Sequence, residues 1–131
     1  MSMEKIRRFE DLEIFQTARG LCKDIYLITD AEPFKCDYRF TQQIRAAAGS
    51  IMDNIAEGFE RNGNKEFVNF LFIAKGSCGE VRSQLLRAND VGYIDEITFQ
   101  QLYNGTLELG RKIYYLAQKI KDAGNPGSKY Q

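Results

Sequence analysis

Residues 50–80 read SIMDNIAEGFERNGNKEFVNFLFIAKGSCGE, and this stretch decides the fold. Its two halves place apolar residues at every third or fourth position, and the break NGNK at residues 62–65 separates them. Apolar residues at this spacing indicate a helix with one buried face, and Gly63 is a residue at which a helix ends easily. A short connection makes consecutive helices antiparallel neighbours. The stretch therefore predicts two antiparallel helices that pack against each other.

The same periodicity continues outward on both sides of this pair. Pro33, Gly92 and Gly124 mark further positions where a helix is hard to continue. We therefore predict an all-α fold, an antiparallel up-down four-helix bundle, as a single domain over residues 1–124 with a flexible C-terminal tail at 125–131. The helices are expected at about residues 9–29, 41–62, 65–90 and 95–122. The expected N-cap residues are Thr41, Asn64 and Asp95.

The apolar seam of this bundle follows from the 3–4 spacing within the four segments. Its members are Leu12, Phe15, Cys22, Ile25, Ile44, Ala48, Ile51, Ile55, Phe59, Phe67, Leu71, Ala74, Cys78, Val81, Leu85, Leu102, Leu109, Ile113, Leu116 and Ile120. Glycines inside the helices cost about 1 kcal/mol each relative to alanine, so they are expected where another backbone comes close. These glycines are Gly49, Gly58, Gly76, Gly79 and Gly110.

Composition narrows the class of protein. The chain has 131 residues, of which 44% are hydrophobic and 27% charged, and it contains three cysteines but no histidine. The cysteines fit neither a zinc-ligand pattern nor a disulfide framework, so we expect reduced thiols. No apolar run approaches the ~20 residues of a membrane span, and the first residues lack an apolar leader core. We expect a cytoplasmic protein that does not enter a membrane.

The motifs S-I-x-x-N-I-A-E-G-F-x-R and E-F-x-x-F-L-x-I-A-x-G-S-x-x-E carry a family resemblance. F-x-x-L-x-I-F precedes them, T-Q-Q-I-R-A-A-A leads into the first, and A-N-D-V-G-Y-I follows the second, so the match extends over residues 9 to 121. The chain resembles the four-helix-bundle proteins encoded by intervening sequences of bacterial 23S ribosomal RNA genes, the S23-like family. It is also similar to the accessory variability determinant of diversity-generating retroelements. The resemblance implies a ring-like homo-oligomer, expected to be a pentamer.

Two polar stripes lie on the helices predicted from this stretch. On the second helix they comprise Ser50, Asn54, Glu57 and Arg61, and on the third Ser77, Glu80, Gln84 and Arg87. Spacings of three and four residues place each set on one side of its helix. One hypothesis is a ligand or nucleic-acid groove. The interpretation that we favour is a structural hydrogen-bonded network that fixes the register between helices, because buried polar groups need partners.

Basic clusters provide the candidate nucleic-acid contacts. They are Lys5, Arg7, Arg8, Arg45, Arg111, Lys112, Lys119 and Lys121. Relatives encoded within ribosomal RNA insertions, and the retroelement subunit that engages a reverse transcriptase and RNA, imply binding of RNA or DNA. Against strong binding, 18 basic residues balance 18 acidic ones. Solvated i,i+4 pairs such as Glu108 with Lys112 are the alternative. The family often has a second basic residue where this chain has Ala46, which weakens the case for Arg45.

A second apolar row on the fourth helix widens its apolar face beyond one seam. The candidate oligomer-interface residues are Phe72 on the third helix and Phe99, Tyr103, Leu107 and Tyr114 on the fourth. Exposed apolar patches commonly mark protein contacts, although these side chains could instead cover the flank of the bundle. The hypothesis from a different class is accordingly a protein-interaction scaffold that docks a partner enzyme such as a reverse transcriptase, without nucleic-acid affinity of its own.

An enzyme is not expected. Without histidine the common general-base and triad arrangements are missing, and no phosphate loop or dinucleotide fingerprint occurs. Glu57 and Glu80 could suggest a carboxylate pair, but the di-iron scheme of helical bundles requires Glu-x-x-His. Cys78 has no evident activating base and is expected to be a packing thiol. We expect no cofactor and no metal.

Overall fold

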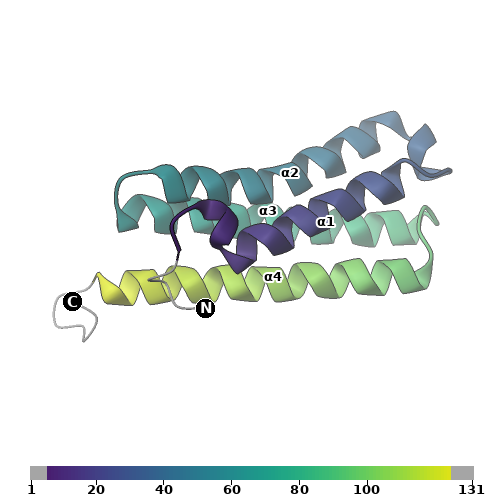
Figure 1. The fold of residues 1–131 in the computed structure, drawn as a ribbon. Helices are drawn as coiled ribbons and strands as arrows, with labels where there is room; N and C mark the ends of the chain where they lie inside the picture. The colour runs from purple at the N-terminus through teal and green to yellow at the C-terminus, as the bar shows by residue number, and fades with distance from the viewer. Residues whose placement is uncertain (1–5, 125–131) are drawn as a thin grey trace.

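The computed structural model describes residues 6–124, which form four long helices arranged as an antiparallel up-down bundle (Figure 1). They are α1 (Glu13–Thr29), α2 (Tyr38–Glu60), α3 (Asn64–Asp90) and α4 (Glu96–Ala123). Two short 3-10 turns, η2 (Phe9–Asp11) and η3 (Phe34–Cys36), precede α1 and α2. Each helix contacts the next along the chain, and α1 also contacts α4. This arrangement confirms the predicted all-α four-helix fold. The predicted tail at 125–131 lies outside the described residues.

The first helix is shorter than predicted because the segment before it forms a separate turn. The carboxylate of Asp11 accepts hydrogen bonds from the backbone N–H groups of Arg7 and Arg8, each at 3.1 Å. These bonds lower the pKa of Asp11 below its usual value. Leu12 then adopts extended backbone angles, with φ −76° and ψ 130°, so that α1 begins at Glu13 rather than at residue 9.

The second helix begins three residues before its predicted start, because Asp37 is its N-cap. One carboxylate oxygen of Asp37 accepts a hydrogen bond from the backbone N–H of Phe40 at 3.2 Å, and the other accepts one from the Tyr93 hydroxyl at 2.8 Å. Thr41, the predicted cap, is buried inside the helix and donates its hydroxyl hydrogen to the carbonyl of Phe34 at 3.2 Å. Asp37 therefore joins the α1–α2 connection to Tyr93 in the α3–α4 connection.

The cap predictions for the other two helices have different outcomes. Asn64 is the first residue of α3, and its expected capping position belongs to Gly63, whose φ of 132° favours glycine. Asp95 is confirmed as the N-cap of α4, since its carboxylate accepts a hydrogen bond from the backbone N–H of Thr98 at 2.7 Å.

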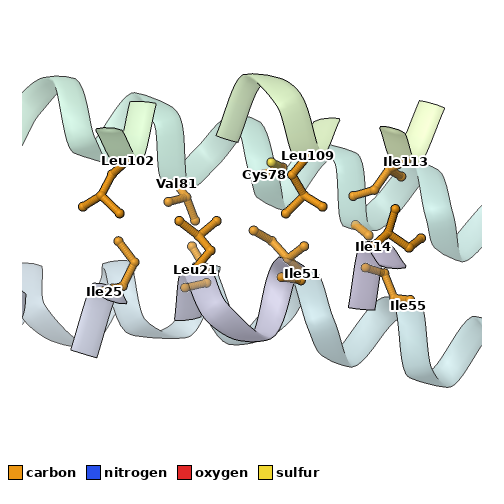
Figure 2. Packing of buried hydrophobic residues seen from close by; sticks show 14 of the residues in the cluster. Ile14, Leu21, Ile25, Ile51, Ile55, Cys78, Val81, Leu102, Leu109 and Ile113 are labelled. Carbon is orange, nitrogen blue, oxygen red and sulfur yellow. The ribbon is translucent and has the colours of Figure 1, made fainter. Parts of the chain in front are cut away.

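A single hydrophobic core runs along the bundle axis (Figure 2). In Figure 2, Ile25 and Leu102 lie toward one end of the core, whereas Ile14, Ile55 and Ile113 lie toward the other. Most predicted seam residues are buried there, while four lie partly buried at its edge. These four are Cys22, Phe59, Leu116 and Ile120. The 3–4 spacing thus identified which side of each helix faces inward.

Only one of the five singled-out helix glycines has a close neighbour that explains it within the chain. A Cβ atom at Gly58 of α2 would lie 2.5 Å from the Cβ of Phe70 in α3, so the two helices meet closely there. A Cβ at Gly49, Gly76 or Gly110 would meet nothing within 4 Å. At Gly79 it would meet only the end of the Arg82 side chain, at 3.7 Å.

Candidate nucleic-acid interface

Polar residues on the α2 side of α3 form a small hydrogen-bonded cluster between the two helices. The hydroxyl groups of Ser50 and Ser77 are hydrogen-bonded to each other at 2.9 Å. The Asn54 amide donates to the carbonyl of Ser50 at 2.7 Å and to its hydroxyl at 3.0 Å. These three predicted network residues therefore connect α2 with α3 through direct bonds.

The remaining stripe residues form separate local pairs. Arg61 donates to Glu57 one turn earlier at 2.7 Å, on the exposed surface. The side-chain amide nitrogen of Gln84 donates to the Glu80 carboxylate at 3.5 Å. The side-chain oxygen of Gln84, Oε1, is buried without a hydrogen-bond partner among residues 6–124. The structure thus divides the predicted network into three groups. A groove of about 540 Å³ lies beside them, lined by Gln43, Ala46, Ala47, Ser50, Glu80, Ser83, Gln84 and Arg87.

On its other side, α3 forms a second groove with α4, which we call the α3/α4 groove. It has a volume of about 400 Å³ and is lined by Lys75, Arg82, Leu107, Gly110, Arg111 and Tyr114. Three of these six residues are cationic and none is acidic. Within residues 6–124, no carboxylate lies within ion-pair distance of the three cations. The α3/α4 groove therefore presents positive charge that the described part of the chain does not neutralise.

Two exposed aromatic rings accompany these cations. The side chains of Phe72 and Tyr114 are 37% and 47% exposed, and their ring centroids lie 6.3 Å apart. The ammonium group of Lys75 lies 5.9 Å from the centroid of the Tyr114 ring. Cation and aromatic surface thus adjoin each other on α3 and α4.

The predicted basic residues do not all gather at this groove. Arg111 lines it, but its neighbour Lys112 makes ion pairs with Glu13 of α1 and Glu108 of α4. The hydrogen bond with Glu13, followed by that with Glu108, raises the pKa of Lys112 above its usual value. The charge of Lys112 is therefore neutralised within the chain. One of its two partners, Glu108, is the i,i+4 partner predicted from the sequence.

The other candidate contacts lie elsewhere. Arg45 on α2 is half-buried, with its Nε donating to the Thr29 hydroxyl at 2.9 Å and its guanidinium 4.5 Å from the Tyr26 ring. Lys119 lies over the ring of Tyr115, at 5.7 Å. Arg7, Arg8 and Lys121 are exposed near the ends of the described chain. Lys5 lies outside the described residues.

Sequence reasoning missed Lys75 and Arg82. They are seven residues apart on α3, so they share one side of the helix, and they lie beside its apolar seam. That spacing is the signal that could have identified them, but their meeting with Arg111 depends on how α3 and α4 pack.

The predicted oligomer-interface residues also separate by environment. Phe99 is only 6% exposed, so it belongs to the core rather than to a surface, because this row of α4 faces inward at the helix start. Tyr103 and Leu107 are half-buried. Phe72 and Tyr114 are the exposed members; Tyr114 lines the α3/α4 groove, and the ring of Phe72 lies next to that of Tyr114.

Two further features concern metal binding and thiol chemistry. No group of three Cys, Asp or Glu side chains that could hold a metal ion occurs in residues 6–124. Burial raises the pKa of the Cys78 thiol to about 11, and the thiol donates a weak hydrogen bond to the Thr106 carbonyl at 3.1 Å. Cys78 is thus a packing residue. Within the same range, no helix has the length and apolar character needed to cross a bilayer.

Four antiparallel helices around one core, with a hydrogen-bonded α2–α3 contact, define a helical-bundle protein of the up-down class. The chain belongs to the 23S rRNA-intervening sequence protein family, whose sequence pattern matches residues 10–115. A crystal structure of a protein with unknown function from the S23 ribosomal protein family of Bacteroides thetaiotaomicron has the same fold, with a TM-score of 0.74. The two sequences are 19% identical, and the alignment covers 80% of this chain and 98% of that one. No curated protein matches this chain.

Proposed function

We propose that this protein is a non-catalytic, cytoplasmic nucleic-acid-binding protein whose α3/α4 groove contacts phosphate groups. The observation that carries the proposal is the set of three cations, Lys75, Arg82 and Arg111, that has no carboxylate partner among the described residues. In a chain with 18 basic and 18 acidic residues, such segregation creates a local positive potential that the net charge conceals. RNA is the favoured nucleic acid, in view of the ribosomal RNA context of the family.

Binding by a single chain should be weak. Each phosphate contact with duplex contributes roughly −0.9 to the slope of log affinity against log salt, so three contacts give about −2.7. A homo-oligomer would repeat the groove and gain avidity from several weak contacts. The family resemblance favours a pentameric ring, which we retain as a proposal.

Fluorescence anisotropy with a labelled structured RNA, across a salt series, tests the proposal. We expect saturable binding at low salt, and we expect the substitutions Arg82→Gln and Arg111→Gln each to reduce the salt slope by about one unit. The matched control is Lys112→Gln, which removes a cation adjacent to Arg111 that is already paired with Glu13. Absence of binding at low salt, or an equal loss in the Lys112→Gln control, would refute the groove as the phosphate site.

A second candidate function is a scaffold that docks a partner enzyme, for which the retroelement resemblance suggests a reverse transcriptase. The exposed rings of Phe72 and Tyr114 favour this alternative, because exposed aromatic residues are enriched at protein interfaces. Docking through such apolar contacts should respond little to added salt. A partner complex that persists at high salt, together with no RNA binding at low salt, would support the scaffold.

A further inference from the structure

The α3/α4 groove contains more than phosphate binding requires. Cations alone would contact the backbone of any nucleic acid, but Tyr114 exposes an aromatic ring in the groove and Phe72 exposes another beside it. Their rings are inclined by 56°, so they offer two differently oriented surfaces rather than one continuous stack. Exposed rings next to lysine and arginine are a combination that stacks bases and holds phosphates together.

The groove also has room beside these rings. Gly110 lines it without a side chain, and a Cβ there would meet nothing within 4 Å. On the α3 side of the groove, a Cβ at Gly79 would lie 3.7 Å from the end of the Arg82 guanidinium, so this flexible side chain follows the surface of its own helix. A planar group can therefore approach Tyr114 between the cations of α3 and Arg111 of α4.

We infer that the α3/α4 groove binds single-stranded nucleic acid, with unpaired bases stacked on Tyr114 and Phe72 and the backbone phosphates on Lys75, Arg82 and Arg111. This inference rests on the proposed phosphate-binding function and specifies its ligand. In a duplex the base faces are already stacked on one another, so the two rings would contribute little. A single strand presents both base faces and phosphates.

A second copy of the same groove is a poor occupant. In a symmetric pair the same surface meets itself, so three cations would face three cations with no acidic residue in the groove lining. Docking of this groove on a different, acidic surface of another copy is the competing arrangement, and it would compete with nucleic acid for the same rings.

The test compares a labelled 20-nucleotide single-stranded RNA with a blunt-ended RNA duplex of 20 base pairs, by anisotropy at two salt concentrations. We expect the wild-type protein to bind the single strand about tenfold more tightly. Tyr114→Leu and Phe72→Leu keep apolar volume but remove the ring faces. Each should weaken single-strand binding several-fold, with a much smaller effect on duplex binding and on the salt slope. The control is Tyr115→Leu, because Tyr115 is 67% exposed but does not line the groove.

The particle mass of each variant is measured alongside by light scattering. Equal affinity for the two RNAs, or an unchanged preference in Tyr114→Leu, would overturn the single-strand inference while leaving phosphate binding in place. A drop in particle mass in Tyr114→Leu, with loss of binding to both RNAs, would show that the groove joins copies of the chain and overturn the inference. No binding of either RNA by the wild-type protein would refute the proposed function as well.

Discussion

Helix α3 lies between α2 on one side and α4 on the other, and polar residues occur on both sides. Toward α2, the hydroxyls of Ser50 and Ser77 and the amide of Asn54 are bonded to one another. Toward α4, Lys75 and Arg82 have no carboxylate partner among the described residues. The difference shows that a polar stripe on a helix can have either of two roles. Where its groups find partners within the chain they hold helices together, and where they do not they remain available to a ligand.

The largest effect should come from adding a side chain at Gly58, where α2 and α3 approach closely. Gly58→Ala would put a Cβ 2.5 Å from the Cβ of Phe70, an atom fixed to the backbone, so the helices must separate. We expect a loss of about 1–3 kcal/mol in the free energy of unfolding, measured by urea denaturation. Gly49→Ala is the control in the same helix, because its Cβ meets nothing within 4 Å. It should stabilise the protein by up to about 1 kcal/mol. If Gly58→Ala and Gly49→Ala changed the free energy of unfolding by the same amount and in the same direction, this account of Gly58 would be wrong.

The next effect concerns the hydrogen-bonded cluster on the α2 side. Ser50→Ala and Ser77→Ala should each cost about 0.5–1.5 kcal/mol of unfolding free energy, because each leaves the other hydroxyl without its partner. The double variant should cost less than the two single costs together, with a coupling energy of about 0.5 kcal/mol or more. RNA affinity should not change in any of the three. Strict additivity would contradict the hydroxyl–hydroxyl coupling, and a loss of RNA binding without a loss of stability would mean that the cluster belongs to a ligand site.

Cys78 lies on the buried face of α3, between the two polar sides, and should resist thiol reagents. With a pKa of about 11, only roughly a thousandth of this thiol is ionised at pH 8, and the side chain is fully buried. Exposed Cys36 should react first with iodoacetamide, as identified by peptide mass spectrometry. Rapid labelling of Cys78 in the folded protein would indicate that α3 and α4 separate readily.

The smallest effect is the pH dependence that comes from Glu13 and Lys112. The hydrogen bond with Lys112 lowers the pKa of Glu13 in the folded state, so its stabilisation is present above the unfolded pKa of about 4.3. That stabilisation is lost as the pH falls through the lower folded pKa. Glu13→Gln should therefore reduce the thermal midpoint more at pH 6 than at pH 3, and high salt should narrow the gap. The same gap at both pH values would indicate that Glu13 acts through packing rather than charge.

The fold could be predicted because the sequence repeats one signal many times. Apolar spacing along a helix depends on the helix alone, so residues such as Ile51, Leu71 and Ile113 reveal the inner face before any partner is known. Boundaries depend on single residues in connections. Asp37 caps α2 because the chain turns there, and nothing in the periodic pattern distinguishes it from Thr41 three residues into the helix.

The candidate site was less predictable because it depends on pairs of helices. Arg111 and Lys112 are adjacent in sequence and equally basic, yet a rotation of about 100° along α4 places one in the α3/α4 groove and the other against Glu13 of α1. Which of two neighbouring cations remains unpaired is decided by the packing of α1, α3 and α4. Helical spacing likewise places Phe99 and Tyr114 in one apolar row of α4. In the packed bundle, however, Phe99 is buried and Tyr114 is exposed.

The two oxygens of Asp37 serve two connections at the same end of the bundle, one capping α2 and the other accepting the hydroxyl of Tyr93. The rings of Phe34 and Tyr93 lie 5.1 Å apart beside this carboxylate, so both connections pack against the same end of the hydrophobic core. Amide protons in the two connections should therefore exchange with solvent water in a single cooperative opening. The α2–α3 turn at the opposite end, around Gly63, is bridged by the exposed ion pair of Arg61 with Glu66 and should exchange earlier. Thermal fraying of the bundle is expected to start from the Gly63 end and to reach Asp37 last.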